Sequence, residues 1–294
     1  MELVKLATSI FTVTKAVACG DRIDAVLTMP AGMEVVPAED GTPAPADTPA
    51  VTLEGVSLTY EGGAAPALHG VDLTVPRGHT VGIIGGTGSG KSTLASLIPR
   101  FYDATEGRVT VLGRDVRTYD PSELRAHIGV VPQKAELFRG TIRSNLLWGK
   151  ADATDEELWH ALEVAQAADF VREKDGGLDA PVEQKGRNLS GGQRQRLTVA
   201  RALVGSPDIL ILDDSASALD FATDARLRKA LRELRGEPTV FIISQRTSSI
   251  RACDTILVLD DGAVVGKGRH DELLTSCEVY REIHESQFKG GETA

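Results

Sequence analysis

The 294-residue sequence lacks features that mark several specialised classes of protein. Its three cysteines (Cys19, Cys253 and Cys277) are far apart and form no CxxC pair, which argues against a disulfide framework or a cysteine zinc site. Because 42 acidic residues outnumber 32 basic ones, the net charge of -10 argues against nucleic acid as the main partner. No run approaches the roughly 18 uncharged apolar residues of a membrane span. We therefore expect the chain by itself to be soluble and intracellular.

What is present is an ordinary globular composition, with 41% hydrophobic and 25% charged residues. Residues 1–36 carry one apolar helical stripe, whose continuation Gly20 weakens. The stripe comprises Leu3, Leu6, Ile10, Val13 and Val17. Such a helix either packs on its own domain or meets a partner outside this chain. The second is favoured, because nothing nearby matches the stripe before a Pro/Ala-rich linker at 37–50.

The main domain is predicted to span residues 51–288, with a tail at 289–294. Short apolar strands recur at 81–84, 130–131, 209–212, 240–243 and 256–259. Between them, helical spacing appears at 93–98, 156–167, 193–203 and 225–234. Strands that alternate with helices predict an α/β fold with a largely parallel sheet covered on both faces.

The strand at 81–84 leads directly into a loop of the form G-x-x-x-x-G-K-[ST]. The loop consists of Gly85, Gly86, Thr87, Gly88, Ser89, Gly90, Lys91 and Ser92, followed by Thr93. Its glycines allow backbone N–H groups to point at phosphate oxygens, and Lys91 adds a positive charge for the β- and γ-phosphates. The Ser92 hydroxyl can ligate Mg²⁺. The loop predicts a nucleoside triphosphate site without assigning it a task.

Two further patterns accompany this loop. The buried strand at 209–212 ends in Asp213-Asp214, and a carboxylate there can hold the Mg²⁺ shell opposite Ser92. The second pattern, Leu189-Ser190-Gly191-Gly192-Gln193, lies between the phosphate loop and this strand. Ser190 in it is a helix N-cap, and the glycines allow close approach to a ligand. The chain would then have two phosphate-binding helix starts but one Mg²⁺-holding strand. Two copies facing head to tail would resolve this mismatch.

With these motifs, residues 51 to about 287 resemble the nucleotide-binding domain of an ABC transporter of the exporter type. Residues 189–193 match the family signature, which contacts ATP held by the opposite subunit. The resemblance implies a P-loop NTPase (RecA-like) core, an antiparallel β subdomain, and a helical subdomain at about 134–190 that carries the signature. ATP and Mg²⁺ are the implied cofactors, and a cytoplasmic position at the inner membrane is the implied location.

The resemblance also assigns roles to single residues. Tyr60 matches the aromatic that stacks on adenine, and Gln133 the loop glutamine that reaches Mg²⁺. Asp220, in Ser217-Ala218-Leu219-Asp220, matches the loop that crosses the dimer interface. Residues 138–145 resemble the exporter pattern after the glutamine. Residues 16–27 resemble the cytosolic end of an exporter's last membrane helix, so the membrane helices are expected upstream of Met1.

Two departures from the family pattern both concern hydrolysis. Family members that hydrolyse ATP well carry Glu directly after the Mg²⁺ aspartate, where this chain has Asp214. The shorter arm withdraws the carboxylate by about 1.5 Å. Family members also carry His where this chain has Gln245, which can donate a hydrogen bond to the γ-phosphate but cannot carry a positive charge. The motifs that bind ATP and the signature are intact.

Three hypotheses follow. In the favoured one, the chain is the weakly hydrolytic half of a heterodimeric exporter, and it lends Ser190, Gly191, Gly192 and Gln193 to a partner's competent site. In the second, it is a homodimeric exporter ATPase in which Asp214 is the base. In the third, it is a soluble ABC protein without a transport role. The transported substrate is not readable, because membrane helices select it.

Overall fold

The computed structural model of the protein describes residues 1–29, 33–36, 47–215, 219–234 and 238–289. The chain divides into two compact units, Met1–Glu34 and Val35–Ala294. Most of the predicted linker (37–46) and of the predicted tail (290–294) lies outside the described residues, as do Ser217 and Ala218 of the predicted interface loop.

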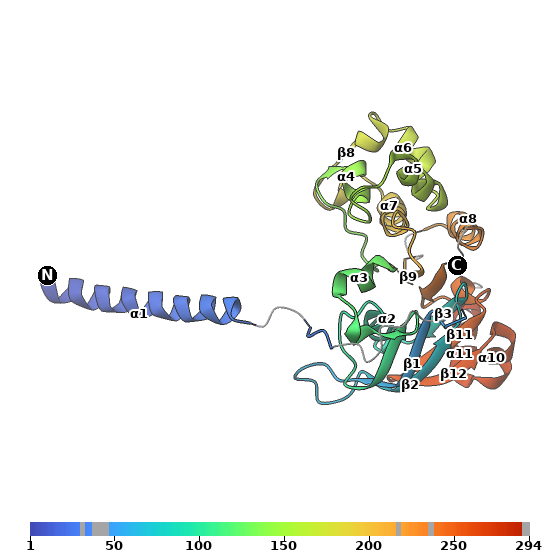
Figure 1. Cartoon of the computed structure of the whole chain (residues 1–294), viewed down its shortest axis with the longest axis horizontal. Coiled ribbons are helices and arrows are strands. Elements are labelled where there is room, and N and C mark those ends of the chain that lie inside the picture. Colours follow the sequence, from blue (N-terminus) through green and yellow to red (C-terminus); the bar gives the residue numbers. More distant parts are fainter. Residues whose placement is uncertain (30–32, 37–46, 216–218, 235–237, 290–294) are drawn as a thin grey trace. The chain divides into compact units, whose positions relative to one another are not determined.

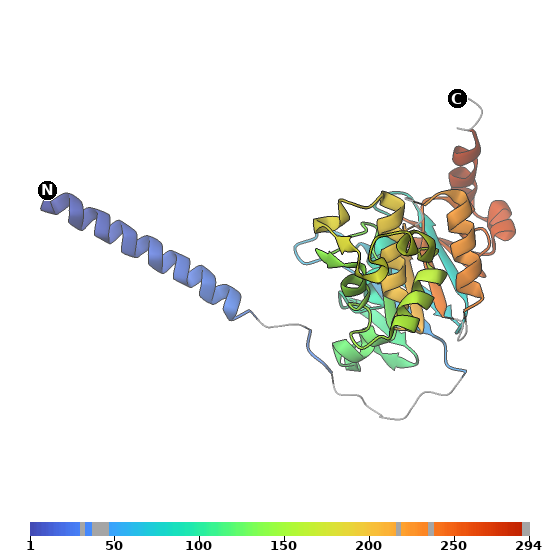
Figure 2. The same cartoon turned by 90° about the horizontal axis from the view of Figure 1, so that it is seen from above.

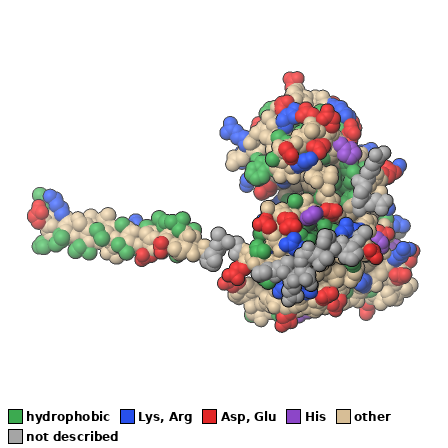
Figure 3. Space-filling view, viewed as in Figure 1, with side chains coloured by type: hydrophobic (Ala, Val, Ile, Leu, Met, Phe, Trp, Pro, Cys, Tyr) green, Lys and Arg blue, Asp and Glu red, His purple; other side chains and the backbone are tan. Residues whose placement is uncertain are grey.

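The first unit is the helix α1 (Glu2–Leu27), in which no residue is buried. Its apolar side chains are exposed along its length, with exposed fractions from 57% at Val17 to 82% at Leu3 (Figure 3). The helix continues through Gly20, where the sequence predicted a weakening. A single glycine costs only about 1 kcal/mol in a helix interior, which does not interrupt so long a helix.

The expectation that no segment could span a membrane is wrong by length and composition. α1 has 26 residues and contains an 18-residue window of mean hydropathy 1.4 with at most two charged residues. Thr, Ser and Ala separate its larger apolar residues, so the helix holds no long uncharged apolar run although its mean hydropathy is high. A span needs about 20 predominantly apolar residues, and α1 meets that requirement by length and composition alone.

A six-stranded sheet forms the centre of the second unit, in the order β12-β11-β3-β10-β9-β6. Its parallel strands are β3 (Thr80–Gly85), β6 (Ile128–Val131), β9 (Ile209–Asp213), β10 (Thr239–Ile243) and β11 (Thr255–Asp260). The edge strand β12 (Ala263–Gly268) is antiparallel. Strands β3, β9 and β10 bury nearly all their residues, as expected of a parallel sheet with both faces covered. The predicted α/β fold is confirmed.

A second, antiparallel sheet has the order β2-β1-β4-β5. Its strands are β1 (Val51–Leu58), β2 (Leu68–Val75), β4 (Glu106–Val111) and β5 (Arg114–Asp115). Alternate residues of β1, such as Val51 and Leu53, are buried in one hydrophobic cluster with Ile83 of β3 and Leu94 of α2 (Lys91–Leu97). The antiparallel sheet therefore packs against the side of the domain that carries the phosphate loop.

A group of short helices follows β6, before strand β9. It comprises α4 (Ile142–Leu146), α5 (Asp155–Val164) and α6 (Ala168–Arg172), with the two-stranded pair β7 (Gly140–Thr141) and β8 (Pro181–Val182). Figure 1 shows this group apart from the strands of both sheets, and α7 (Gly191–Leu203) leads from it back to β9. Leu146, Leu158 and Leu197 join the group to α7 in one buried cluster.

The remaining helices flank the central sheet. They are α3 (Pro121–Ala126), α8 (Phe221–Arg232), α9 (Thr247–Ile250), α10 (His270–Ser276) and α11 (Glu278–Lys289), with 3-10 turns at Val116–Thr118, Gly177–Asp179 and Gln184–Gly186. In Figures 1 and 2, α10 and α11 lie away from the α4–α6 group. Fully buried Tyr280 fixes the start of α11 in the larger hydrophobic cluster.

Candidate functional site

Four neighbouring parallel strands end at one edge of the central sheet, and each leads into a predicted site residue. In the registers, Ile243 of β10 pairs with Ile83 of β3 on one side and with Asp213 of β9 on the other. Val131 of β6 pairs with Leu212. The phosphate loop, Gln245, Asp214 and Gln133 therefore follow four adjacent strands in spatial order. Ligands in open α/β sheets bind at such carboxyl ends.

The phosphate loop makes a tight turn between β3 and α2. At Gly85 a Cβ would lie 2.1 Å from the carbonyl oxygen of Leu259 and 2.5 Å from Ser89 Oγ, so only glycine fits. Gly90 has φ of 93°, in the left-handed region, and no side chain caps α2. These constraints fix the loop geometry, and the N-cap Gly90 has no side chain that could bond the first N–H groups of α2.

Lys91 is folded back onto this loop. Its Nζ donates to the carbonyl oxygens of Gly85 at 3.0 Å and Gly86 at 2.5 Å, and to Ser89 Oγ at 3.3 Å. Burial lowers the pKa of Lys91, while the nearby carboxylates Asp213 and Asp214 act to raise it. With 8% of its surface exposed, the ammonium group is held where it can exchange carbonyl oxygens for phosphate oxygens.

Two side chains with oxygen atoms that could ligate a metal ion lie beside the loop. Ser92 Oγ donates to Asp213 Oδ1 at 3.3 Å, which joins the start of α2 to the end of β9. Burial raises the pKa of Asp213, the Ser92 hydrogen bond lowers it, and Asp214 raises it further, for a net increase. A hydroxyl and a partly buried carboxylate are the hard oxygen ligands that Mg²⁺ prefers, so this pair fits that ion.

Asp214 directly follows the end of β9. Its backbone has φ of 43°, a left-handed conformation that Asp and Asn tolerate better than most residues. Its N–H donates to the carbonyl oxygen of Ile243 at 2.9 Å. Gln133 Nε2 donates to Asp214 Oδ2 at 3.4 Å, across from the end of β6. Two residues 81 positions apart are thereby in contact at one edge of the sheet.

Gln245 lies in the turn after β10, and its side chain is exposed. The preceding Ser244 is buried, and its N–H donates to the carbonyl oxygen of Ile83 at 3.1 Å. The carbonyl oxygen of Gln245 accepts a 2.7 Å hydrogen bond from Nε2 of Gln287, near the end of α11. The motifs used in the sequence analysis gave no indication of Gln287.

Tyr60 lies over the start of α2. Its hydroxyl is 2.9 Å from Thr93 Oγ1, and its ring makes an edge-on contact with Tyr102 at a centroid separation of 5.0 Å. Both tyrosines are exposed, at 38% and 46%. An exposed ring beside the phosphate loop is suited to stack on a nucleotide base. Tyr102 was not predicted as a site residue, because none of the sequence motifs includes it.

The signature residues stand at the exposed start of α7. Ser190 Oγ accepts from the Gln193 N–H at 3.2 Å, and Gln193 Oε1 accepts from the Ser190 N–H at 3.0 Å, which forms a capping box. Gly191 is exposed, and a Cβ there would meet nothing within 4 Å. Among the described residues, no hydrogen bond or ion pair joins residues 190–193 to the phosphate loop.

Asp220 is the N-cap of α8. Its two carboxylate oxygens accept from the N–H of Thr223 at 2.9 Å and from the Thr223 hydroxyl at 2.8 Å. These hydrogen bonds lower the pKa of Asp220. The predicted interface residue therefore has a structural task at the start of α8, and it is exposed at the surface.

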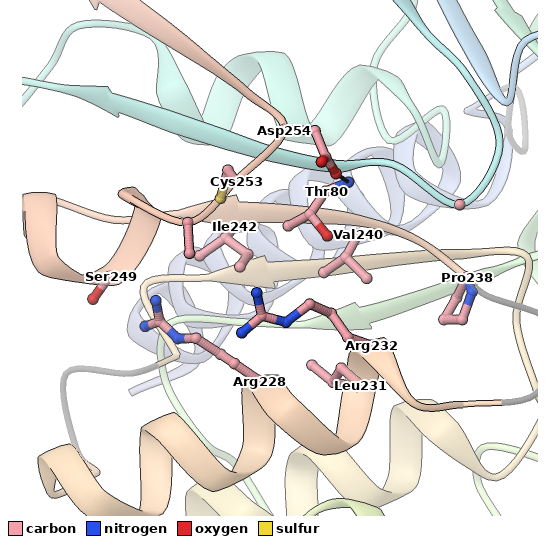
Figure 4. A pocket seen from close by; sticks show the side chains of 12 residues that line it. Thr80, Arg228, Leu231, Arg232, Pro238, Val240, Ile242, Ser249, Cys253 and Asp254 are labelled. Atoms are coloured by element: carbon pink, nitrogen blue, oxygen red, sulfur yellow. Dashed lines mark hydrogen bonds between the residues drawn. The ribbon is translucent and has the colours of Figure 1, made fainter. Parts of the chain in front are cut away.

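A separate cavity of about 280 Å³ lies between α8 and β10 (Figure 4). Arg228 and Arg232 extend from α8 along this cavity, and Val240 and Ile242 line the sheet side. The guanidinium of Arg228 is already paired with Asp224, at 2.5 and 3.0 Å. None of the residues predicted to bind ATP lines this cavity, so it is distinct from the edge of the sheet described above.

Comparison with known proteins places these features in a family. A family model described as ABC transporter matches residues 68–217. An uncharacterized ABC transporter ATP-binding protein of Mycobacterium tuberculosis is 44% identical over 276 residues, which cover 93% of this chain and 47% of that protein. An ATP-dependent lipid A-core flippase of Vibrio vulnificus is 43% identical over 242 residues, covering 82% of this chain and 42% of the flippase.

A solved structure agrees with these relatives. A bacterial Atm1-family ABC exporter with ATP bound has a TM-score of 0.79 and 38% sequence identity to this chain. The match covers 86% of this chain and 45% of the exporter. This chain thus spans about half the length of the curated relatives that it matches.

Proposed function

The chain belongs to the ABC transporter family, and from that premise we propose that its own ATP site hydrolyses weakly while its signature completes the site of a partner subunit. It is the ATP-binding domain of an ABC exporter, by its similarity to exporter relatives of the family and to a solved exporter. The family couples ATP hydrolysis to transport, and such domains lie on the cytoplasmic side of the membrane. The weak site and the different partner are the proposed refinements.

Nucleotide binding is assigned to the phosphate loop and the groups around it. Lys91 exchanges its carbonyl partners for phosphate oxygens, and the loop N–H groups hold the remaining ones. Tyr60 stacks on the base. Ser92 and Asp213 ligate Mg²⁺, with Gln133 nearby. When bound, this ion neutralises charge on the β- and γ-phosphates. These roles are supported by the convergence of the residues at one sheet edge.

The weak hydrolysis rests on Asp214 and Gln245. A general base must come within hydrogen-bond distance of its water, and a misplacement of about 1 Å costs roughly 100-fold in rate. The Asp214 carboxylate is about 1.5 Å shorter in reach than a Glu at this position. Gln245 can donate an amide hydrogen bond to the γ-phosphate but cannot add a positive charge. The observation that carries the proposal is that Gln245 and Asp214 follow β10 and β9, the two successive strands beside β3, so that both residues lie at the sheet edge that carries the phosphate loop.

The signature is assigned to a second nucleotide. Ser190 and Gly191 stand at the exposed start of α7, where the N–H groups of Gly191 and Gly192, outside the capping box, suit an anion brought by another subunit. A head-to-tail pair places each signature opposite the other subunit's phosphate loop. Closure of such a pair around ATP would be transmitted through the Gln133 region to membrane helices.

We assign α1, within residues 1–36, to the cytosolic end of an exporter's last membrane helix, followed by the linker at 37–50 and the nucleotide-binding domain at 51–288. The unburied apolar side chains of α1 support this assignment, because they need a partner. The partner in the assignment is a membrane domain at the inner membrane. The second half of the exporter would be a different subunit, and the transported substrate stays open.

One observation favours the alternative of a homodimeric exporter. Gln133 Nε2 contacts Asp214 Oδ2, so the Asp214 carboxylate is oriented and could serve as a base despite its shorter arm. Under this alternative the chain would hydrolyse ATP without a different partner. The heterodimer account predicts slow ATP hydrolysis by this chain alone, and the homodimer account predicts efficient hydrolysis.

The deciding experiment is steady-state ATP hydrolysis at high protein concentration. The double variant Asp214→Glu, Gln245→His restores the family residues, and we expect it to exceed the wild type by about 100-fold, the scale of a 1 Å misplacement. Each single change should give a part of the gain. Adding Lys91→Met to the double variant provides the background rate. Equal rates in the wild type and the double variant, both above that background, would establish Asp214 as a working base and support the homodimer.

A further inference from the structure

The turn that carries Gln245 is held from outside by the last helix of the domain. Gln287 Nε2 donates to the carbonyl oxygen of Gln245 at 2.7 Å. Gln287 Oε1 accepts from the N–H of Thr247 at 2.9 Å and from the Thr247 hydroxyl at 3.0 Å. One side-chain amide thus bridges the two residues on either side of Arg246.

The orientation of this amide is determined by its partners. The N–H of Thr247 can only donate and the carbonyl of Gln245 can only accept, so a flipped amide would lose both hydrogen bonds. His284 Nδ1 lies 3.1 Å from Thr247 Oγ1, and it can donate to the hydroxyl that donates to Gln287. The bridge therefore has a single arrangement.

The position of Gln287 follows from the packing of α11. Tyr280 is fully buried and Ile283 packs against the same core. Residues 280, 284 and 287 lie on one face of a helix, at spacings of four and three. The buried tyrosine thus fixes the helix, and its second half presents His284 and Gln287 to the start of α9.

The remaining backbone of the turn is also fixed. Ser244 N–H donates to Ile83 O at 3.1 Å, and Arg246 N–H donates to Ser244 Oγ at 3.0 Å. The N-cap of α9, Arg246, provides no side-chain cap, and Gln287 supplies that hydrogen bond to Thr247 instead. The hydrogen bond to the Gln245 carbonyl is not part of the helix cap, because it holds the residue before the N-cap Arg246.

We propose that Gln287 is a positioning residue that sets the direction of the Gln245 side chain toward the γ-phosphate. The inference rests on the proposed function, in which Gln245 contacts that phosphate. An exposed side chain in a free turn would lose rotational and backbone freedom on contacting ATP, and a turn that is already fixed loses less. Gln287 therefore favours ATP over ADP, which lacks the γ-phosphate, without touching either nucleotide.

The test is the ratio of ATP to ADP affinity in the full chain, measured by calorimetry with Mg²⁺. Gln287→Glu is the informative variant, because a carboxylate still accepts from Thr247 and keeps the cap of α9 but cannot donate to the Gln245 carbonyl. We expect ATP affinity to fall by about five- to tenfold, the scale of one ordinary hydrogen bond between uncharged groups, with ADP affinity unchanged. Gln287→Met, which adds no charge, should give the same shift. Glu282→Leu, an exposed residue of the same helix, is the matched control and should change neither affinity.

Gln245→Ala separates this inference from the proposed function. It should lower ATP affinity selectively, and adding Gln287→Glu to it should have no further effect. If Gln245→Ala is selective but both Gln287 variants leave the ratio unchanged, Gln287 is only a cap and the inference is wrong. Equal loss of ATP and ADP affinity in the Gln287 variants would also overturn it, as a general structural effect. If Gln245→Ala itself does not change the ratio, both the inference and the assigned role of Gln245 fail.

Discussion

Two glycine-containing turns in this domain each lead into a helix, yet they treat an anion differently. At the start of α2, no side chain caps the helix, and buried Lys91 contacts the loop's own carbonyl oxygens. At the start of α7, Ser190 and Gln193 satisfy each other's backbone N–H groups and are open to solvent. The first turn leaves the N-terminal N–H groups of α2 without a side-chain cap, so a bound phosphate could accept hydrogen bonds from them. The start of α7 has its capping hydrogen bonds within the chain, and in the proposed function it acts on a nucleotide that another subunit holds.

Under the proposed function, this difference lets one chain divide its contributions between two nucleotides. A buried lysine next to two carboxylates commits the α2 turn to a charged ligand with a metal ion. Residues 190–193 carry no charged side chain, and the nearby guanidinium of Arg194 donates to the carbonyl oxygens of Gly186 and Leu189, so in the proposed role these residues add neutral hydrogen-bond donors to a phosphate that another loop holds. Mutations should therefore separate ATP binding at the α2 turn from the proposed contribution of the α7 turn to a partner's ATP site.

The largest expected effect concerns the α2 turn. Lys91→Met removes the charge that faces the phosphates, and we expect the Kd for Mg-ATP to rise by about 100-fold, as for loss of a charge-assisted contact. Gly191→Asp at the α7 turn is the matched change, because its Cβ meets nothing in the chain. Its Kd should stay within about twofold of the wild type in the same calorimetric titration. Similar losses in both variants would remove the distinction between the two turns.

A complementation assay tests the α7 turn in its proposed role. A chain with Asp214→Glu, Gln245→His and Gly191→Asp has a restored site but no working signature, and it should be silent alone. Mixing it with wild type should raise ATP hydrolysis by at least about tenfold, because the wild-type signature completes the restored site. Replacing the wild type with Gly191→Asp should abolish the gain. A gain that persists would show that the signature does not act in trans.

The two turns should also differ in their response to pH. Burial raises the pKa of Asp213, so this carboxylate protonates at a higher pH than an ordinary aspartate and then loses its charge for Mg²⁺. We expect the gain in ATP affinity from Mg²⁺ to shrink as the pH is lowered from 8, because the protonated carboxyl is a poorer Mg²⁺ ligand than the carboxylate. In Asp213→Asn the gain in ATP affinity from Mg²⁺ should be small and independent of pH. This variant therefore separates the titration of Asp213 from the titration of ATP itself. An equally steep profile in Asp213→Asn would exclude Asp213 as its source.

The smallest effect separates the stability of α7 from its contact with a partner. Ser190→Ala removes the N-cap and should lower the free energy of unfolding in urea by about 1 kcal/mol. Ser190→Asp keeps a good cap, so stability should be retained, while its negative charge should block complementation by repelling phosphate. Complementation by Ser190→Asp at the wild-type rate would show that Ser190 does not face a phosphate.

Much of the fold and of the site could be predicted because its signals are contiguous. The phosphate loop occupies eight consecutive residues between a strand and a helix, and the buried strands are short apolar runs. The strand order β12-β11-β3-β10-β9-β6 could not be predicted in this way, because it depends on which strands pair across the chain. The contact of Gln133 with Asp214 required both that order and the register of β6 with β9.

Residues that act through packing gave no local signal. Tyr102 was not identified because only the approach of Tyr60 brings the two rings together. The membrane-span expectation for α1 failed for the opposite reason, because a search for uncharged apolar runs ignores mean hydropathy over a whole helix. The first miss needed a contact between residues far apart in the sequence, whereas the second needed an average over consecutive residues.

The sequence by itself determined the family, the phosphate loop, the signature and the two substitutions at Asp214 and Gln245, because each is a short motif whose chemistry depends on residue type and spacing. The tertiary structure decided which of these meet. It brought Ser92 to Asp213 and Gln133 to Asp214, and it left the signature at an exposed helix start. It also placed Gln287 against the Gln245 turn, since parallel strands bring their ends to one edge and a buried tyrosine fixes the last helix beside it.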